Sequence, residues 1–253
     1  MRPRTALVLL CGLLWAAPCP GGQPPPPRVL ALLGEDFFAS EYWEPYYALT
    51  AAGYRVDPAG AKAGTVRSAL PCPDAAALED VKADDYLGLF VPGGKGPENL
   101  EKHPRAAELC REFRAAGKVV GAICHGPRLL LSAGAIGRQV HTVLWVVKDE
   151  LPAAWRDPAR GPYVDEAAVV DGNLVTSRCP WDAVAFARAM LGRLHAAGGP
   201  APPELPLRVA AVAGGAEPHL RMALLTGGLP ALGAEVRAVE AGVTVFNLVG
   251  VED

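Results

Sequence analysis

An apolar stretch that runs directly into Cys124 and His125 is the part of this sequence best suited to chemistry. The segment VVGAICHGP (119–127) has a strand pattern up to the cysteine, and glycine and proline follow the histidine. A sharp turn from strand to helix would lift the Cys124 side chain above the edge of a sheet, where the first N–H groups of the helix favour a thiolate. The sequence therefore predicts that Cys124 is a nucleophile; the alternative is a buried cysteine that packs as a small hydrophobe.

The elements around Cys124 alternate between apolar, strand-like runs and helix-like periods. This alternation predicts an α/β fold, in which a doubly wound, mostly parallel sheet lies between layers of helices. Strands are predicted at 29–33, 54–57, 87–91, 118–123 and 140–147, with a hairpin over 168–176, and helices at 41–52, 98–116, 128–133 and 180–195. Ligands of such a fold meet the carboxyl ends of the strands, where Cys124 is predicted to lie.

Four motifs occur in a fixed order along the chain: EYWEP (41–45), YLGLFVPGG (86–94), AICHGP (122–127) and DGNLVTSR (171–178). Together they resemble the ThiJ/PfpI family of class I glutamine amidotransferase-like proteins, which includes PfpI-type peptidases and the parkinsonism-associated deglycase. The resemblance covers roughly residues 28–194. It implies a flavodoxin-like, class I glutamine amidotransferase-like fold and a nucleophilic Cys124, and it says much less about the substrate.

Two backbone donors are predicted to stabilise the oxyanion that forms when Cys124 attacks a carbonyl. The N–H group of His125 follows the nucleophile directly, which is the usual position of the first donor at such a turn. Gly94 is the predicted second donor, because glycine in the Pro-Gly-Gly turn allows the backbone to approach closely. The predicted oxyanion-binding groups are therefore the backbones of Gly94 and His125.

Glu41 is the predicted acidic partner of the nucleophile. By resemblance it falls in register with the family's acidic residue, four positions before Pro45. A carboxyl group that burial keeps protonated would donate a hydrogen bond to the thiolate and shuttle protons. The alternative is a solvated glutamate in the first turn of a helix, where negative charge is favourable in any case.

The ring of His125 is predicted to act as a general base or as a substrate ligand. Adjacent side chains at a strand–helix junction usually diverge, so a direct hydrogen bond between Cys124 and His125 is geometrically demanding. The resemblance implies a homo-oligomer, because peptidase-like members are thought to complete the site with an acidic residue of a neighbouring subunit. Where some members place a further histidine, this chain has Val143, and His141 lies two residues earlier on the same face of the predicted strand.

Cys179 departs from the family pattern, which usually has glycine between the equivalents of Arg178 and Pro180. This loop lies near the nucleophile in relatives. We therefore predict that Cys179 is a redox partner of Cys124, able to form a reversible disulfide with it or to resolve its oxidised form.

Three classes of function fit these residues. The leading one is a cysteine-dependent enzyme that acts on small reactive carbonyls, as a cofactor-independent glyoxalase or deglycase. The alternatives are a PfpI-like cysteine peptidase or amidase with a peptide substrate, and a non-catalytic redox sensor, chaperone or binding module. Glutamine amidotransfer is not expected, because that chemistry uses a downstream His-x-Glu pair and none of the five histidines has Glu two positions later.

The composition is that of one principal globular unit. The chain has 253 residues, 51% of them hydrophobic, and a net charge of -3, which gives no electrostatic reason to expect a nucleic-acid partner. No zinc-ligand spacing or CxxC pair occurs, and the segment GGKG (93–96) lacks the spacing of a phosphate-binding loop. We therefore expect neither a metal nor a cofactor.

The first 27 residues are predicted to be a signal peptide followed by a Pro/Gly-rich linker. Arg2 and Arg4 precede an apolar run over 6–17, which is too short to span a bilayer comfortably. We therefore expect export to a periplasm or out of the cell, with an uncleaved membrane anchor as the alternative. The four cysteines that remain after cleavage could form two disulfides, and their pairing stays open: Cys72, Cys110, Cys124 and Cys179.

The C-terminal part contains a partial internal repeat. After the ThiJ/PfpI-like domain (28–195) and a linker (196–207), residues 208–236 align without gaps with 28–56. We predict that 208–253 form a partial second copy of the fold, beginning strand–helix–strand. It is predicted to be inert, because Arg221 takes the place of Glu41 and no second elbow follows; the alternative is a chance similarity between two such units.

Overall fold

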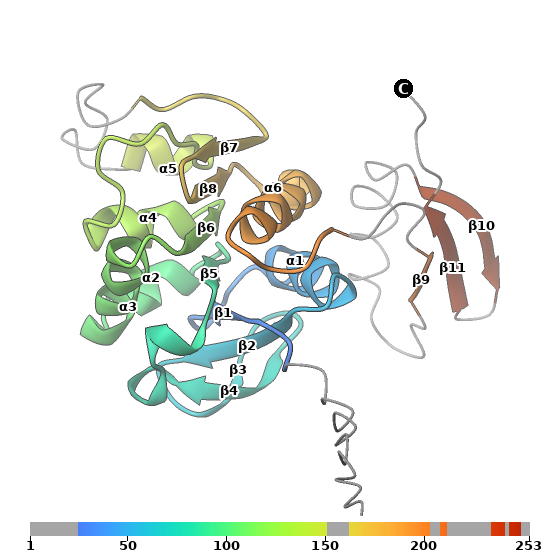
Figure 1. Ribbon diagram of the computed structural model, residues 1–253, viewed down its shortest axis with the longest axis horizontal. Helices are drawn as coiled ribbons and strands as arrows, with labels where there is room; N and C mark the ends of the chain where they lie inside the picture. The colour runs from blue at the N-terminus through green and yellow to red at the C-terminus, as the bar shows by residue number, and fades with distance from the viewer. Residues whose placement is uncertain (1–24, 151–161, 203–207, 212–233, 241–242, 249–253) are drawn as a thin grey trace, which may run out of the picture.

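An eight-stranded sheet organises the protein (Figure 1), and the computed structural model describes residues 25–150, 162–202, 208–211, 234–240 and 243–248. Its strand order is β3-β4-β2-β1-β5-β6-β8-β7. The strands are β1 (Arg28–Leu32), β2 (Arg55–Gly60), β3 (Gly64–Val66), β4 (Cys72–Ala77), β5 (Gly88–Val91), β6 (Val119–Ile123), β7 (Ala168–Asp171) and β8 (Leu174–Ser177). The inner pairs are parallel, and the edge pairs β3–β4 and β7–β8 are antiparallel. The predicted doubly wound, mostly parallel sheet is confirmed.

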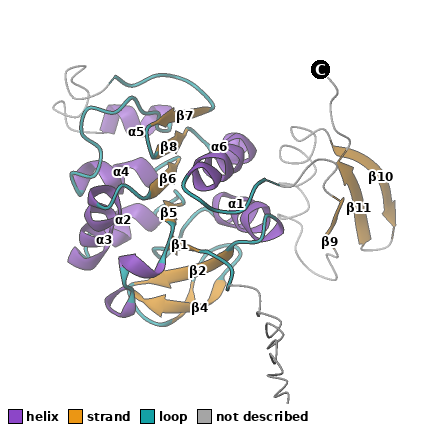
Figure 2. Cartoon of the chain, viewed as in Figure 1, coloured by secondary structure: helices purple, strands orange, loops and turns teal. Residues whose placement is uncertain are grey.

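Helices cover both faces of this sheet (Figures 1 and 2). They are α1 (Ala39–Ala51), α2 (Gly96–Leu100), α3 (Pro104–Ala115), α4 (Gly126–Ser132), α5 (Trp145–Glu150) and α6 (Ala183–Ala196), with short 3-10 turns at Leu78–Asp80, Ala83–Asp85 and Pro180–Asp182. Helices α1 and α6 pack together on one face, while α4 packs with both α2 and α3 on the other. The buried strands between them are apolar on both sides, as a covered parallel sheet requires.

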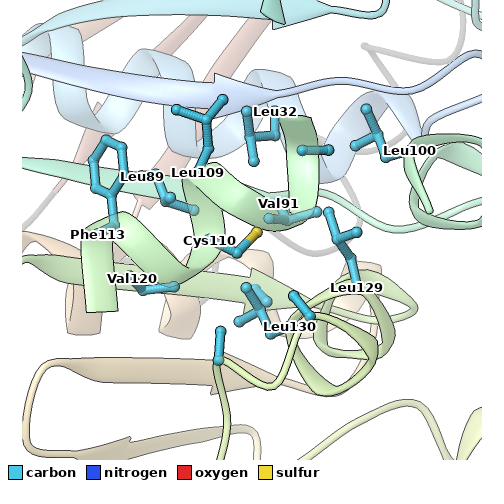
Figure 3. Close-up of a cluster of buried hydrophobic side chains, with 14 of the residues drawn as sticks. Leu32, Leu89, Val91, Leu100, Leu109, Cys110, Phe113, Val120, Leu129 and Leu130 are labelled. Carbon is cyan, nitrogen blue, oxygen red and sulfur yellow. The ribbon is translucent and has the colours of Figure 1, made fainter. Parts of the chain in front are cut away.

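Two hydrophobic clusters fill the space between the sheet and the helices. Successive side chains of a strand point to opposite faces, so β1 sends Leu30 and Leu32 into one cluster and Val29 and Ala31 into the other. Figure 3 shows part of the first cluster, where side chains of α3 and α4 pack against the central strands. The elbow after β6 is thus built on a strand that is buried along its whole length.

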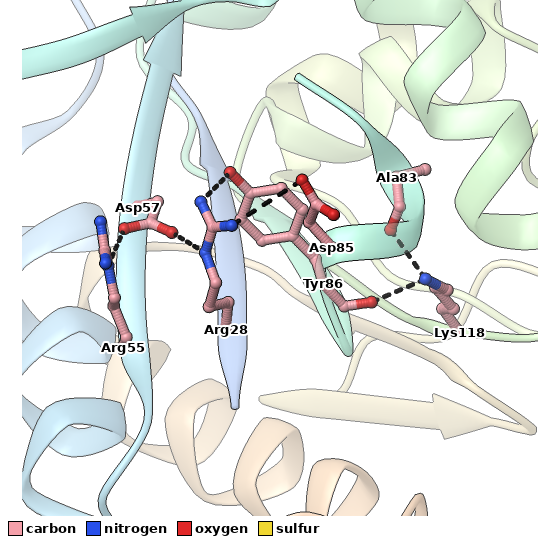
Figure 4. Close-up of polar contacts among 7 residues, drawn as sticks. All are labelled: Arg28, Arg55, Asp57, Ala83, Asp85, Tyr86 and Lys118. Atoms are coloured by element: carbon pink, nitrogen blue, oxygen red, sulfur yellow. Dashed lines mark hydrogen bonds and ion pairs between the residues drawn. The ribbon is translucent and has the colours of Figure 1, made fainter. Parts of the chain in front are cut away.

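The amino-terminal ends of the central strands are tied together by polar contacts (Figure 4). Arg28 at the start of β1 donates to Asp57 of β2 at 2.6 Å and to the Tyr86 hydroxyl at 2.9 Å. Lys118, just before β6, donates to the carbonyl oxygens of Ala83 and Tyr86 at 2.7 and 2.8 Å. These contacts fix the strand ends that lie away from Cys124.

Two of the differences from the predicted elements have physical causes. Residues 140–147 do not form a strand, because β8 occupies the place beside β6; the segment makes one isolated bridge, His141 to Tyr163, and enters α5. The single helix predicted over 98–116 is two helices, since His103 is extended and Pro104 begins α3. The short strands β3 and β4 were not predicted from the sequence.

Beyond residue 202 the structure describes three strands, β9 (Arg208–Ala211), β10 (Ala234–Glu240) and β11 (Val243–Leu248). They form an antiparallel sheet in the order β10-β11-β9. Residues 212–233, where the repeat would place its helix, lie outside the described residues, so the partial second copy stays a prediction. The predicted signal peptide also lies outside them; no helix within the described ranges is long and apolar enough to cross a membrane.

Candidate functional site

The chain turns sharply at Cys124, between the end of β6 and the start of α4. Cys124 has φ 62, a left-handed conformation that only two other non-glycine residues adopt in the described part of the chain, Asp36 and Asp74. Such a backbone costs about 1–3 kcal/mol and persists where the surroundings enforce it. Here the Cys124 N–H donates to the Ser177 carbonyl at 2.9 Å, and the Cys124 carbonyl accepts from the Leu144 N–H at 3.2 Å. The strand–turn–helix geometry is the one predicted from the sequence.

Gly93, in the loop after β5, lets that loop touch the elbow. A Cβ atom on Gly93 would lie 2.7 Å from three atoms: Cβ of Cys124, Oε2 of Glu41 and the backbone nitrogen of His125. No side chain fits in that space. Sequence reasoning had identified the Pro-Gly-Gly turn but had assigned a role only to the second glycine, Gly94.

Glu41 lies in the first turn of α1 and is fully buried. Its Oε2 accepts a hydrogen bond from the Gly93 N–H at 2.8 Å, and its Oε1 has no hydrogen-bond partner among the described residues. Burial raises the pKa of Glu41 to about 8, although hydrogen bonds from Gly93 and Cys124 act in the opposite direction. Glu41 is therefore not a solvated helix-start residue, and its carboxyl group holds a proton at neutral pH.

The sulfur of Cys124 is itself buried, with 4% of the residue exposed. Burial raises the pKa of the Cys124 thiol well above its ordinary value, and the neighbouring carboxyl of Glu41 raises it further. The N–H groups of Gly94 and His125 donate hydrogen bonds to the sulfur and lower that pKa, but by less. The elbow alone therefore does not give the thiolate that the sequence analysis expected; the ionisation belongs to the Cys124–Glu41 pair.

Both predicted oxyanion donors reach the nucleophile. The N–H groups of Gly94 and His125 converge on the Cys124 sulfur from different loops. Gly94 has φ 72, and a Cβ there would lie 2.6 Å from the Asp36 carbonyl oxygen, so the position requires glycine. An oxygen on a carbon atom bonded to the sulfur would lie next to these donors. Their role in binding an oxyanion stays a prediction.

The ring of His125 also reaches the sulfur. Its Nδ1 lies 3.3 Å from Sγ of Cys124. Adjacent side chains at a strand–helix junction usually diverge, and the left-handed backbone at Cys124 permits this contact. The structure thus brings Cys124, His125, Glu41 and Gly94 together at the carboxyl ends of β5 and β6.

His141 and Cys179 have other partners. His141 is buried, and its Nδ1 lies 3.1 Å from the Gln139 carbonyl oxygen. The Cys179 thiol donates to Oδ2 of Asp182 at 3.2 Å; burial, followed by Asp182, raises its pKa to about 11. All four cysteines within the described ranges are free, and no group of three or more metal-ligating side chains gathers there.

Residues 27–193 match the family model described as the DJ-1/PfpI family. The chain belongs to the DJ-1/PfpI family. A DJ-1/PfpI relative named as a deglycase, from Pyrococcus abyssi, is 35% identical over 163 residues, which cover 64% of this chain and 95% of the relative. Protein/nucleic acid deglycase 2 of Escherichia coli is 33% identical over 175 residues, 67% of this chain and 98% of that protein.

A solved DJ-1/PfpI structure supports the fold. The ThiJ/PfpI domain protein of Brachyspira murdochii superimposes with a TM-score of 0.62 at 22% identity, over 68% of this chain and 99% of that one. The match supports the sheet and helix arrangement described above and leaves the substrate open. Relatives named for deglycase activity support an activity of DJ-1/PfpI type in general.

Proposed function

We propose that this protein is a cysteine-dependent enzyme that acts on small reactive carbonyl compounds, as a glyoxalase or deglycase without a cofactor. The observation that carries the proposal is the meeting of one sulfur, one buried carboxyl and two backbone N–H donors at Cys124. The sulfur supplies a nucleophile, the carboxyl a proton, and the N–H groups a place for developing negative charge. The Pyrococcus and Escherichia relatives are named as deglycases, which supports the deglycase form of this proposal.

The chemistry of a 2-oxoaldehyde balances without an added oxidant. The Cys124 thiolate attacks the aldehyde carbon; a C–S bond forms, and the carbonyl oxygen takes a proton to give a hemithioacetal. The remaining hydrogen on that carbon leaves as a proton and returns to the neighbouring carbonyl carbon through an enediol. The first carbon is thereby oxidised to a thioester and the second is reduced to an alcohol. Water then replaces the sulfur, and a 2-hydroxy acid leaves.

Glu41 and His125 are the groups that handle these protons. The pKa of about 8 lets Glu41 give a proton to the forming alkoxide and regain one later. The ring of His125, 3.3 Å from the sulfur, serves as the base that carries the carbon-bound proton. An amine adduct of the same aldehyde enters the reaction when its C–N bond breaks and the amine departs with a proton.

A cysteine peptidase or amidase is the second candidate, and the contact between Cys124 and His125 favours it. A cysteine–histidine pair can generate the thiolate and protonate a leaving amine. Peptide hydrolysis needs no proton transfer between carbon atoms, whereas the conversion of a 2-oxoaldehyde does. Assays of peptide cleavage and of 2-hydroxy acid formation therefore distinguish the two activities. The third candidate, a redox sensor, chaperone or binding module, retains the elbow without turnover.

The deciding experiment measures methylglyoxal consumption together with D- and L-lactate formation by reduced, purified protein. We expect lactate from the wild type and none from Cys124→Ala or Glu41→Gln. Gly192→Ala is the matched control, since a Cβ there meets nothing within 4 Å. If the reduced wild type forms no lactate, the carbonyl proposal fails, and a panel of peptide substrates then distinguishes a peptidase from a non-catalytic protein.

Two properties of the whole protein belong to the same proposal. We propose export through cleavage of the N-terminal segment, which sequencing of the mature N-terminus tests, and assembly into a homo-oligomer, which light scattering on the mature protein tests. Arg2, Arg4 and the apolar run that follows are the basis for the first. The resemblance to peptidase-like members is the basis for the second.

A further inference from the structure

Three large aromatic side chains are exposed on segments that follow β1 and β8 or that contact the elbow through the backbone, and the proposed mechanism does not use them. Phe38 is 46% exposed, Trp145 51% and Trp181 70%. They belong to three separate connections of the sheet: the one before α1, the start of α5, and the turn between β8 and α6. Exposed aromatic surface is unfavourable in water, and where it forms a patch it marks a place where an apolar group binds.

Phe38 is anchored to the loop that touches the nucleophile. Its N–H donates to the Gly93 carbonyl oxygen at 3.1 Å. A Cβ atom on Gly93 would in turn lie 2.7 Å from Cβ of Cys124. Phe38 is therefore one backbone hydrogen bond away from the glycine that packs on the nucleophile.

Trp145 is tied to the elbow through the residue that precedes it. The preceding residue, Leu144, donates its N–H to the Cys124 carbonyl oxygen at 3.2 Å. Trp145 is the first residue of α5, and its neighbour Val146 is also exposed. This apolar corner is thus fixed to the backbone of the nucleophile itself.

Trp181 approaches from the end of β8. The Cys124 N–H donates to the Ser177 carbonyl oxygen at 2.9 Å, which joins the elbow to that strand end. The chain then turns back, so that the Ser177 hydroxyl lies 3.5 Å from the carbonyl oxygen of Asp182, the residue after Trp181. The indole therefore projects from a turn that is pinned to the same strand end.

The positive charge of Arg178, next to this turn, is already paired with two carboxylates. Arg178 donates to Asp165 at 2.9 Å and to Asp182 at 2.9 Å. A cation held by two carboxylates has little left to offer a substrate anion. The surroundings of Trp181 therefore favour an uncharged group over a phosphate or a carboxylate.

We infer that Phe38, Trp145 and Trp181 form an apolar subsite beside Cys124 that selects carbonyl substrates bearing an aromatic or bulky aliphatic substituent. The inference rests on the proposed function, because it names the substrate class of the same site. A methyl group is too small to contact aromatic side chains from three loops, whereas a phenyl ring or the side chain of a large apolar residue can. Methylglyoxal is then a minimal substrate that leaves this subsite unfilled.

Paired substrates test the subsite. Phenylglyoxal and methylglyoxal carry the same reacting group and differ in the substituent. We expect Phe38→Ala, Trp145→Ala and Trp181→Ala each to lower kcat/KM for phenylglyoxal about threefold to tenfold relative to kcat/KM for methylglyoxal. Trp181→Phe should retain most of the preference. Val170→Ala is the matched control, since Val170 is 47% exposed but lies on the edge strand β7.

Equal losses for both substrates, or no loss for either, would overturn the subsite and leave the proposed function standing. If the wild type turns over neither substrate, alkylation of Cys124 tests the subsite instead. Cys124 attacks N-benzyl iodoacetamide and iodoacetamide in the same way, forming a C–S bond as iodide leaves. We expect the alkylation rate with the benzyl reagent, divided by the rate with iodoacetamide, to fall in Trp181→Ala. An unchanged ratio overturns the subsite, and this test does not require the protein to turn over a substrate.

A subunit interface is the competing explanation for the exposed rings. Light scattering on the wild type and on the three alanine variants distinguishes the two. If the variants dissociate an oligomer while the ratio for the two substrates stays constant, the aromatic residues bind a second copy and the inference is wrong. If the mass is unchanged while the ratio shifts, the subsite is supported.

Discussion

The Gly93 nitrogen lies 2.8 Å from Oε2 of Glu41, so the loop after β5 holds the buried acid in place beside Cys124. The same glycine packs against Cβ of Cys124, where no side chain has room. One residue therefore sets the positions of both partners in the proton-sharing pair.

Gly93→Ala tests this arrangement. The added methyl group would lie 2.7 Å from atoms of Cys124, Glu41 and His125, and the loop must move to relieve these contacts. We expect kcat/KM to fall by at least about a hundredfold, because displacements near 1 Å at a reacting centre have that effect. The Gly192→Ala control should fold and react like the wild type. Full activity of Gly93→Ala would show that the loop does not position the pair.

The rate should rise with pH through about 8. The reactive form of the Cys124–Glu41 pair has lost one of its two protons, and burial raises the pKa of Glu41 to about 8 and that of Cys124 further. Below this pH the pair keeps both protons and the thiolate is scarce. In Glu41→Gln the rising limb should move to higher pH, because the group whose pKa is about 8 is gone while burial still raises the pKa of Cys124 well above its ordinary value. Because the variant is expected to form no lactate, a pH profile of Cys124 alkylation by iodoacetamide compares the two proteins, and coincident profiles would contradict the prediction.

Glu41 should make the fold less stable as the pH rises. Its pKa is about 8 in the folded protein against an ordinary value of 4.5, so the folded state binds more protons between these values. The stability is then complete below pH 4.5 and is lost as the pH rises toward 8. We expect Glu41→Gln to be more stable than the wild type by about 3–5 kcal/mol at pH 8 and by little at pH 4.5. Urea unfolding at the two pH values measures this, and a difference that is independent of pH would argue against a buried, protonated carboxyl.

Cys179 should limit the oxidation of Cys124. Peroxide converts the Cys124 thiolate to a sulfenic acid, and attack by the Cys179 sulfur then releases water and forms a disulfide. The pairing of Ile123 with Ser177 brings the two strand ends side by side. The pKa of about 11 and the bond to Asp182 make Cys179 a slow attacker at neutral pH, so Asp182→Asn should accelerate the reaction.

Mass spectrometry of a non-reduced digest after mild peroxide measures the linkage. We expect a peptide that joins Cys124 to Cys179, and more sulfinic acid at Cys124 in Cys179→Ser. The fully buried Cys110, whose pKa burial raises to about 12, is the internal control and should stay reduced. If the linkage never appears, Cys179 is a structural cysteine that caps the turn before α6.

The elbow was predictable because its signals are local. An apolar strand, a cysteine and a glycine that follows it closely are adjacent in the sequence, and the turn between Ile123 and Gly126 leaves them little freedom. Glu41 was identified through the resemblance of the four motifs to a known family. Spacing along the chain could not have identified it, because it lies on α1 and meets Cys124 only through the order of the strands. The burial that raises both pKa values is a property of the packed site and has no signature in a single segment.

The misplaced strand over 140–147 shows where local signals fail. Its apolar residues satisfy a strand pattern, yet the position beside β6 is filled by β8, which is more than 20 residues further along the chain. Competition between segments for one sheet position is decided by the whole fold. The exposure of Phe38, Trp145 and Trp181 was missed for the same reason, because it depends on how the whole chain folds.

The left-handed backbone at Cys124 costs folding free energy at the residue that the proposed reaction requires. Glycine adopts that conformation freely, so a variant that replaces the nucleophile with glycine would relieve strain while removing the reaction. Because Cys124 also packs in a hydrophobic cluster, the strain relieved by glycine is set against the packing that is lost. A nucleophilic role for Cys124 would explain why a cysteine stands at a position whose backbone conformation favours glycine.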